Sequence, residues 1–532
     1  MERKLWLKKG KNFLLKGGLP GALIIVILMS LFVGQVMARD FQICDDKNLS
    51  IMGFIDQGVS IGTNGSSYVD TKSDFQAAIF QALLEAKLTW SPTLSFFSSV
   101  MFNADWAYPI LRHSSNEWKD KGLDQSWDKL FILNHKRDDI LKEMHLTWTP
   151  ENWNIRLGKQ IVVWGETDGY RLMDQINPLD SRRGISDVQF ETTIIPIWLA
   201  KVVRYFRPPV DWMEELACEF VFNPNPTFRG NEPLLVGNDE SGIWSPRVVI
   251  PVGGPYPFDY MYLGSAYNRI KRPGAWADDG FEYGLRLRAL IHDKVITLNA
   301  FYGRDNDFVA QPLPLAPAMI PNNWDGRSIL HPQQKGYYPL LRFVGATFTG
   351  DLSNLYVTAL GGVAPVLRIE SLYAHNTTFE NGISPVIKGG FERHSEFRTA
   401  VGVDWKIWCR ALNPRAAFSI SPQVFHRHIM GHPGYNLTTG GGATVYQQDN
   451  FSTSLMINTT YFHNKIQPMI FWMRDITWPS NMIKAQIAYE PNDRWKYTLG
   501  TLQIFGTTRV GMGMDAMRYK DHVYFTIHYR IN

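Results

Sequence analysis

The sequence predicts an all-β protein, a transmembrane antiparallel β-barrel of about 18 strands with short periplasmic turns and long extracellular loops. Three observations predict this fold. The chain begins like a secreted protein, its later segments alternate apolar and polar residues, and its connections alternate between short and long. Sixteen strands are the second choice, because bacterial outer-membrane barrels keep an even number of strands.

The first observation concerns residues 1–38, which differ from the rest of the chain. A basic head is followed by the apolar run Ala22–Val33 and by a small-residue pattern that ends at Ala38. This order describes a secretory signal peptide, with cleavage after Ala38. An uncleaved anchor is the alternative, but the apolar run is short for a spanning helix. We therefore expect a mature chain of residues 39–532 in the bacterial outer membrane.

Charge and cysteine content exclude several classes of protein. The leader carries a net charge of +5, from six Lys and Arg against one Glu, whereas the whole chain carries +4. The mature chain is thus close to −1, and we expect no nucleic-acid partner. Cys44, Cys218 and Cys409 are far apart and form no CxxC or CxxCH motif, so no zinc ribbon, c-type haem or other cofactor is expected. The chain also has no H-E-x-x-H motif and no P-loop, and we expect no enzyme.

The second observation is period-two alternation, which marks strands with two different faces. It is clearest in residues 522–531, where Val523, Phe525 and Ile527 alternate with polar residues, and it recurs in residues 282–290 and 397–405. A soluble sandwich alternates too, but its sheets have edges that must be protected. Strands of about 10 residues also suit a tilted crossing of a bilayer.

The third observation is the alternation of short and long connections. Short ones lie at residues 91–92, 150–152, 292–294, 351–354, 464–465 and 491–493. Long ones span residues 108–137, 166–195, 224–280, 306–338, 376–393, 430–448 and 506–519. This pattern indicates one barrel domain over residues 39–532. Within it, residues 166–195 are a candidate loop folded into the lumen, and residues 224–280 are a candidate lid or plug. Residues 355–374 are predicted to form one strand, because their alternation stays in phase.

The stretch 153–164 is predicted to be a strand with Arg156, Gln160 and Trp164 on its inward, polar face. Lys159 falls on the apolar face. Either it reaches toward a lipid headgroup, or a bulge near Gly158 turns it elsewhere.

The preceding strand, residues 141–148, places Glu143 and His145 on the same inward face. A two-residue turn would pair His145 with Arg156 and Glu143 with Gly158. Glu143 would then lie diagonally from Arg156, within reach of a long side chain.

The segment Glu166–Arg183 that follows is dense in charges of both signs. Its helix-like centre and Pro178 make it compact, so we expect it to fold into the lumen and narrow it. The alternative is a loop docked by structural salt bridges that never touches cargo, and catalysis is the weakest reading. The predicted lumen or constriction residues are Glu143, Arg156, Gln160, Trp164, Glu166, Asp168, Arg171, Asp174, Asp180, Arg286, Arg288, Arg368, Glu370, Arg398 and Asp404.

The charges on the inward faces of the strands have two readings of their own. They either solvate the wall and cross-link neighbouring strands, or form a ladder that sets the preference for ions or substrates. Both signs are present, so strong anion selectivity does not follow.

The block "ILKEMHLTWTPENWNIRLGKQIVVWGETDGYRLMDQINPLDSRRG" resembles the signature of a bacterial outer-membrane barrel family catalogued as domain of unknown function 1302. Lys159 departs from the pattern, because the family usually has Arg there. The ammonium of a lysine is a point charge and cannot make the paired hydrogen bonds of a guanidinium. The residues that match the pattern are Glu143, Gly158, Gln160, Trp164, Gly165, Glu166, Asp174, Asn177, Pro178 and Asp180.

This resemblance implies a porin-like barrel that handles apolar cargo. It also implies two partners, a periplasmic carrier protein and an inner-membrane transporter. Outer-membrane lipid and the barrel-assembly machinery are expected partners of any such barrel. The chain departs from the usual C-terminal aromatic assembly signal, because it ends in Tyr529-Arg530-Ile531-Asn532.

His426, His428 and His432 form a separate cluster of histidines. Two His at i and i+2 share a strand face, and a third could complete a metal site. Their face is the apolar, lipid-facing one, so the sequence favours histidines at headgroup level and no metal site.

We therefore expect an outer-membrane channel or transporter for small molecules, apolar cargo included, narrowed by a charged loop. A scaffold or docking sleeve for periplasmic or electron-transfer partners is the alternative function. An outer-membrane hydrolase is a weak third reading.

Overall fold

The computed structural model describes residues 39–44, 47–64, 75–106, 140–167, 170–180, 190–231, 249–251, 260–262, 270–312, 318–321, 328–331, 334–353, 361–381, 390–440, 444–506, 514 and 521–531. The predicted signal peptide, its cleavage after Ala38 and the C-terminal Asn532 lie outside the described residues.

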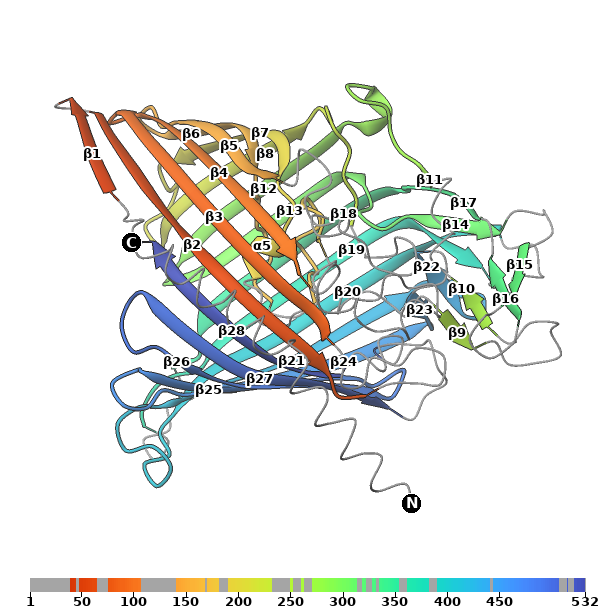
Figure 1. Cartoon of the computed structure of the whole chain (residues 1–532). Helices are drawn as coiled ribbons and strands as arrows, with labels where there is room; N and C mark the ends of the chain where they lie inside the picture. The colour runs from red at the N-terminus through yellow and green to blue at the C-terminus, as the bar shows by residue number, and fades with distance from the viewer. Residues whose placement is uncertain are drawn as a thin grey trace, which may run out of the picture.

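Eighteen strands of the described part of the chain form one closed antiparallel barrel, in which each strand pairs with its two neighbours in the ring (Figure 1). The ring closes where β28 pairs with β2, from Gly53 opposite Ile531 to Gly62 opposite His522. The predicted all-β fold and the predicted strand number are therefore confirmed. The barrel strands are β2 (Lys47–Gly62), β3 (Phe75–Ser91), β4 (Leu94–Asp105), β5 (Leu141–Trp148), β6 (Trp153–Gln160), β7 (Ile197–Phe206), β8 (Met213–Asn223), β12 (Glu282–Ile291), β13 (Lys294–Arg304), β18 (Leu340–Asp351), β19 (Val366–Asn381), β20 (Gly390–Ile407), β21 (Phe418–Ile429), β24 (Asp449–Asn458), β25 (Ile466–Asp475), β26 (Ser480–Tyr489), β27 (Trp495–Gly506) and β28 (His522–Ile531).

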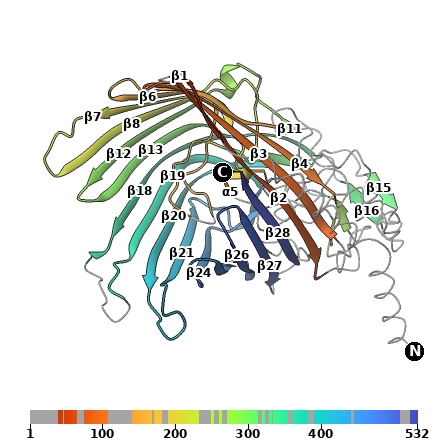
Figure 2. The same ribbon diagram turned by 60° about the vertical axis from the view of Figure 1, so that its left-hand side comes forward.

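The two ends of the barrel differ as predicted. One end, called here the short-turn end, carries brief connections such as Pro92-Thr93 and His292-Asp293, together with the start of β2 and the end of β28. The other end, called the long-loop end, carries the extended connections, with one brief exception between β25 and β26. The strands run obliquely between the two ends (Figure 2).

Smaller elements accompany the barrel. β1 (Arg39–Cys44) forms a hairpin with β2, while β22 (Leu437–Thr439) and β23 (Thr444–Tyr446) extend the wall beside β19. Two small sheets lie beyond the strand ends at the long-loop end (Figure 1). They contain β9 (Val249–Pro251), β10 (Tyr260–Tyr262), β15 (Ala318–Pro321) and β16 (Ser328–His331) in one, and β11 (Ile270–Lys271), β14 (Val309–Pro312) and β17 (Gln334–Tyr337) in the other.

Helices are short. The described residues include a single turn α5 (Phe190–Thr193) and a 3₁₀ turn η3 (Asp278–Gly280). A helix of the length and apolarity that a bilayer crossing demands is not found among the described residues.

The prediction of one strand over residues 355–374 is wrong. β18 ends at Asp351 and β19 begins only at Val366, where the Leu352 N–H donates to the Pro365 carbonyl at 2.8 Å. Gly361 and Gly362 have positive φ angles of 107° and 67°, so the chain turns where the alternation of residue types continues unbroken. The predicted number of strands still holds. One strand, β19, occupies this place in the barrel, but it spans Val366–Asn381 rather than residues 355–374.

The predicted register between β5 and β6 is also wrong, by two residues. His145 lies opposite Gly158, and Thr147 lies opposite Arg156. The connection spans residues 149–152 and is longer than the predicted two-residue turn. The Thr149 N–H donates to the Thr93 carbonyl, in the turn between β3 and β4, at 2.8 Å.

Lys159 does not reach toward a headgroup. Its side chain is buried at 2% exposure, and its Nζ donates to the Leu141 carbonyl at 2.5 Å. The preceding Gly158 has a φ of +134°, a backbone conformation that residues other than glycine rarely adopt.

The barrel wall has an apolar outer face and a polar inner face. Leu298 is 57% exposed, whereas its neighbours Thr297 and Asn299 are buried on the opposite face. The Thr297 hydroxyl shares a hydrogen bond of 2.7 Å with the Thr347 hydroxyl of the next strand. This arrangement places apolar side chains against lipid and polar groups toward the lumen.

Candidate functional site

The connection after β6, residues 161–180, packs against the inner face of the barrel wall. It contributes the buried side chains of Val162, Trp164, Leu172, Met173 and Ile176 to one hydrophobic cluster. Burying a large apolar side chain contributes about 1.5–3 kcal/mol, so this cluster is the main apolar attachment of the loop. The wall side of the cluster comes from β7, β8, β13, β18, β19, β20 and β21, through Ile197, Leu199, Val221, Phe301, Leu341, Phe343, Leu372, Ala374, Ala400 and Phe425.

Glycines in the wall make room for the loop. A Cβ at Gly284 would stand 2.7 Å from Cη2 of Trp164, and one at Gly345 would stand 2.7 Å from Cε of Met173. Trp164 is 1% exposed, and its Nε1 donates to Glu219 at 2.7 Å. The two glycines therefore act as slots in the wall, each filled by one large side chain of the loop.

Glu370, on the inner face of β19, binds the backbone of the loop. Its carboxylate accepts N–H bonds from Glu166, from Thr167 at 2.7 Å and from Met173 at 3.1 Å. The side chain is completely buried. A carboxylate that accepts three backbone donors satisfies groups that the loop could not otherwise pair away from water.

Two residues of the loop brace it from within. Asp174 accepts the N–H groups of Trp164 at 2.6 Å and of Gly165 at 2.8 Å. Asn177 accepts the Val162 N–H at 2.8 Å and donates to the carbonyls of Gln160 and Ile195, at 3.1 and 3.0 Å. Asn177 therefore ties the beginning of the loop to the chain just before β7.

The base of the loop is held by two wall residues. Glu143 accepts the Ile161 N–H at 3.2 Å, and Gln160 donates to the Leu199 carbonyl at 3.1 Å. Just before β7, the Lys142 ammonium donates to the carbonyls of Thr192 and Ile194, at 2.9 and 2.8 Å.

Charged side chains of both signs meet at Glu166. Arg286 lies 3.9 Å from its carboxylate and donates to the Val163 carbonyl at 3.1 Å. Arg368 donates to the Glu166 carbonyl and forms an ion pair of 2.8 Å with Asp404. Burial raises the pKa of the Glu166 carboxyl, while the two arginines oppose that shift.

A cavity of 340 Å³ separates the middle of the loop from the wall of β20, β21 and β24. The loop side is formed by Tyr170, Arg171 and Leu172, and the Tyr170 ring packs edge-on against Phe425 with centroids 4.9 Å apart. Arg171 donates to the Asn177 carbonyl at 3.0 Å, but its Nε and second terminal nitrogen find no partner among the described residues. Burial lowers the pKa of Arg171.

The wall side of this cavity carries a second group of charges. Arg398 and Arg427 both donate to Glu396, which is completely buried. The guanidinium of Arg427 lies over the Tyr446 ring, 3.9 Å from its centroid. Cation–π contacts of this kind hold an arginine in place without neutralising it.

The predicted residues therefore divide into separate groups. Glu143 and Gln160 lie at the base of the loop, and Arg171 and Arg398 lie at the cavity. Seven lie at the centre of the loop or opposite it: Trp164, Glu166, Asp174, Arg286, Arg368, Glu370 and Asp404.

Four predicted residues stand apart from these groups. Asp168 lies outside the described residues. Arg288 pairs with Glu215 at 3.2 Å, toward the short-turn end. Arg156 lies opposite Thr147 and Lys201 in the wall, and Asp180 is buried at the loop's end, where its N–H donates to the Thr193 carbonyl at 2.7 Å.

Sequence reasoning missed Glu219, Glu396 and Arg427. Each occupies an inward position of a strand, so the alternation that found Arg286 and Arg398 could also have found these three. Their partners, however, depend on the pairing of strands that are distant in sequence.

One G-x-S-x-G pattern, Gly58–Gly62, bears on the hydrolase reading. A nucleophile of this type needs a sharp turn between a strand and a helix. Here the pattern lies inside β2, which pairs with β3 and β28 on its two sides, and Ser60 is buried. Ser60 therefore does not stand on the strand-to-helix turn at which this motif presents a nucleophile.

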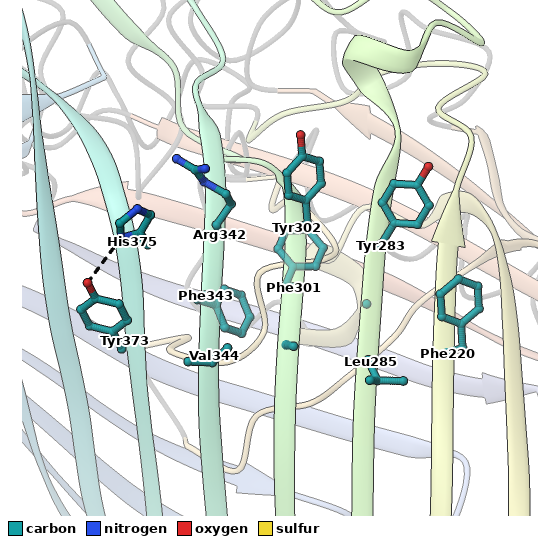
Figure 3. A pocket seen from close by; sticks show the side chains of 12 residues that line it. Phe220, Tyr283, Leu285, Phe301, Tyr302, Arg342, Phe343, Val344, Tyr373 and His375 are labelled. Atoms are coloured by element: carbon teal, nitrogen blue, oxygen red, sulfur yellow. Dashed lines mark hydrogen bonds between the residues drawn. The ribbon is translucent and has the colours of Figure 1, made fainter.

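A second cavity, of 480 Å³, lies on the outer face of β8, β12, β13, β18 and β19 (Figure 3). Gly284 and Gly345 face the loop, so Tyr283, Leu285 and Val344 point away from it. This groove is lined mainly by aromatic and aliphatic side chains and belongs to the lipid-facing surface.

The closed barrel, its apolar exterior and its loop-bearing polar interior define a porin-like protein of the outer-membrane β-barrel class. The chain belongs to the family described as "Protein of unknown function (DUF1302)", whose profile matches residues 21–531. This confirms the resemblance found in the sequence. No curated protein matches the chain.

Solved structures resemble the chain in fold at low identity. The BenF-like porin of Pseudomonas fluorescens Pf-5 has a TM-score of 0.42 and 10% identity, over 92% of this chain and 99% of that one. OccAB2 of Acinetobacter baumannii has a TM-score of 0.42 and 9% identity, over 91% and 97% of the two chains. OpdK of Pseudomonas aeruginosa, solved with vanillate, has a TM-score of 0.42 and 8% identity, over 91% and 98%.

Proposed function

We propose that this protein is an outer-membrane channel or transporter through which small molecules, apolar ones included, pass beside the loop of residues 161–180. The observation that carries the proposal is the cavity of 340 Å³ between that loop and the inner wall. This space lies between the loop and a wall that carries charged and aromatic side chains, as a passage beside the loop requires.

The lining of the cavity supports the passage of more than one kind of molecule. Phe425, Tyr446 and Trp478 offer apolar surface, whereas Arg171 and Arg398 offer hydrogen-bond donors. Arg171 has two nitrogens without partners among the described residues, so a polar group of a cargo molecule would find donors there. We propose Arg171 and Arg398 as the residues of the predicted set that touch cargo.

The other predicted residues near the loop serve to hold it. Glu370 and Asp174 use their polar atoms on the loop backbone, as does Asn177, which was not among the predicted residues. Trp164 is enclosed between Glu219 and Gly284. We therefore propose that most of the loop is docked to the wall and that only its middle contacts cargo.

Orientation follows from the connections. We propose that the short-turn end faces the periplasm and the long-loop end faces the exterior, because barrels of this class carry their brief turns on the periplasmic side. A periplasmic carrier protein would then approach the short turns, and an inner-membrane transporter would act behind it.

Conductance in a planar lipid bilayer tests the proposal. The refolded mature chain should give small single-channel steps, and deletion of residues 166–190 should enlarge them. Absence of conductance in both proteins would contradict the channel and favour the docking sleeve.

A matched pair of single substitutions sharpens this test. Glu370→Gln weakens the acceptor of three loop N–H groups, so we expect larger or noisier steps. Glu215→Gln alters an inward glutamate that is 53% exposed and lies away from the loop, so the step size should stay close to that of the unaltered protein. Equal effects of the two variants would show that the loop does not limit the current.

A further inference from the structure

A group of three potential metal ligands lies on the outer wall at the long-loop end of β21 and β24. The Nε2 of His426 is 2.9 Å from Oδ1 of Asp449, and the Nδ1 of His428 is 2.8 Å from the same oxygen. All three ligand atoms lie within 4.8 Å of one another. The register explains the group, because His428 lies directly opposite Asp449, and His426 is two positions along the same face.

We propose that His426, His428 and Asp449 bind a borderline transition-metal ion, and their ligand chemistry favours Zn²⁺. Two imidazole nitrogens and one carboxylate oxygen suit Zn²⁺, Ni²⁺ or Cu²⁺, whereas Ca²⁺ and Mg²⁺ prefer oxygen ligands alone. Ligand atoms around a tetrahedral Zn²⁺ stand roughly 3.3 Å apart. The shared carboxylate oxygen therefore has to retreat by about half an ångström, and the two imidazole nitrogens, which lie within 4.8 Å of each other, have to adjust toward that spacing. The remaining coordination position is left for water.

The surroundings of the group favour binding. The ring of His426 stacks on Phe451, with centroids 4.3 Å apart and planes 11° from parallel, which restrains its orientation. The side chains of His426, His428 and Asp449 are 32%, 34% and 45% exposed, so an ion can reach them from water at the rim. The sequence offered His432 as a third ligand and favoured histidines at headgroup level; in the structure, Asp449 is the group beside His426 and His428.

The position of the group gives the ion a structural task. It joins the end of β21 to the start of β24, on either side of residues 430–448, where the Ile429 N–H already donates to the Gln448 carbonyl at 2.8 Å. That segment carries β22 and β23, and its Tyr446 lines the cavity beside the loop. The ion would therefore fasten the base of the segment that borders the cavity. Metal binding itself does not depend on the proposed channel function.

Calorimetric titration of the untagged, refolded mature chain with ZnCl₂ tests the site. We expect saturable binding of one Zn²⁺ per chain and no comparable binding of Mg²⁺. The double variant His426→Ala/His428→Ala should bind at least about tenfold more weakly, since loss of even an outer hydrogen-bond partner weakens metal sites by about 10- to 100-fold. The control His375→Ala removes an exposed histidine of β19 that bonds Tyr373, and should bind Zn²⁺ like the unaltered chain.

Two results would overturn the proposal: no saturable binding by the unaltered chain, or equal affinity in the double variant. Heat-modifiable migration on a gel checks that each variant has folded. Should the double variant fail to fold, chemical modification of the unaltered chain decides. Zn²⁺ must protect His426 and His428 from diethylpyrocarbonate while His375 stays reactive, and equal reactivity of all three with and without Zn²⁺ would refute the site.

Discussion

Two inward-facing glutamates show how the halves of the lumen differ. Glu370, beside the loop, is completely buried and accepts three backbone N–H groups. Glu215, toward the short-turn end, has a side chain that is 53% exposed and pairs with Arg288 at 3.2 Å. The two residues carry the same charge and obey the same alternation. The difference comes from their positions along the wall. The loop packs against Glu370, which binds its backbone, whereas Glu215 lies away from the loop and stays exposed.

The largest effect should follow from removing the buried carboxylate. Glu370→Ala leaves three backbone N–H groups of the loop without an acceptor, and each such group costs about 1–3 kcal/mol. We expect a loss of about 3 kcal/mol or more in the free energy of unfolding, measured by urea titration in detergent. Glu215→Ala should change it by no more than about 1 kcal/mol. If both variants lost the same stability, the two halves would not differ as described.

A substitution at a glycine of the barrel wall should loosen the attachment of the loop. Gly284→Val places a side chain 2.7 Å from the Trp164 ring, so the loop has to shift. Overpacking of this kind costs about 1–3 kcal/mol, and we expect faster proteolysis within residues 161–180. Gly402→Ala is the matched control, because its new Cβ would meet only the flexible Gln423 side chain, at 3.1 Å. A loop that stayed resistant in Gly284→Val would argue against the slot for Trp164.

A smaller effect should appear as a pH dependence of loop docking. Burial raises the pKa of Glu166 above its ordinary value of 4.5, so the folded state holds this proton more tightly than the unfolded state does. Its stabilising contribution is complete below pH 4.5 and is lost as the pH rises through the raised pKa. Glu166→Gln should therefore flatten the stability curve just above pH 4.5, when compared with the unaltered chain by urea titration at several pH values. A curve of unchanged slope would show that Glu166 is not the group responsible.

The smallest effect on stability should come from the exposed pair. Arg288→Ala removes one partner of an ion pair in which both side chains are more than a third exposed, and such pairs contribute about 0–1 kcal/mol. The same substitution removes a positive charge from the lumen wall. The reversal potential in a salt gradient should shift toward cation preference while stability stays nearly constant. A change in stability without any shift in reversal potential would reverse the roles assigned to the two halves.

Much of the fold could be predicted because alternation is a local property. The inward positions of Arg286, Glu370 and Arg398 follow from the spacing of residues two apart in one strand. The error at residues 355–374 has a local cause as well. Gly361 and Gly362 turn the chain through positive φ angles, while the residue types around them continue to alternate.

The partners of these residues could not be predicted, because they depend on register across separate strands. Asp404 meets Arg368 only because β19 and β20 pair with Arg368 opposite Gly402. Asp449 meets two histidines only because β24 follows β21 in the ring after the segment of residues 430–448. A shift of two residues, like the one between β5 and β6, would leave each side chain on its face and change every partner.

By itself, the sequence determined the class of fold, the strand number, the two faces of the wall and the family. Each of these rests on periodicity or on a contiguous motif, which the chain carries locally. The tertiary structure alone decided that Glu370 holds the loop, that Trp164 fills the slot at Gly284, and that a cavity remains beside Arg171. These features arise where residues 161–180 meet strands up to about 270 residues later in the chain, such as β21, and only closure of the barrel brings those strands within contact distance.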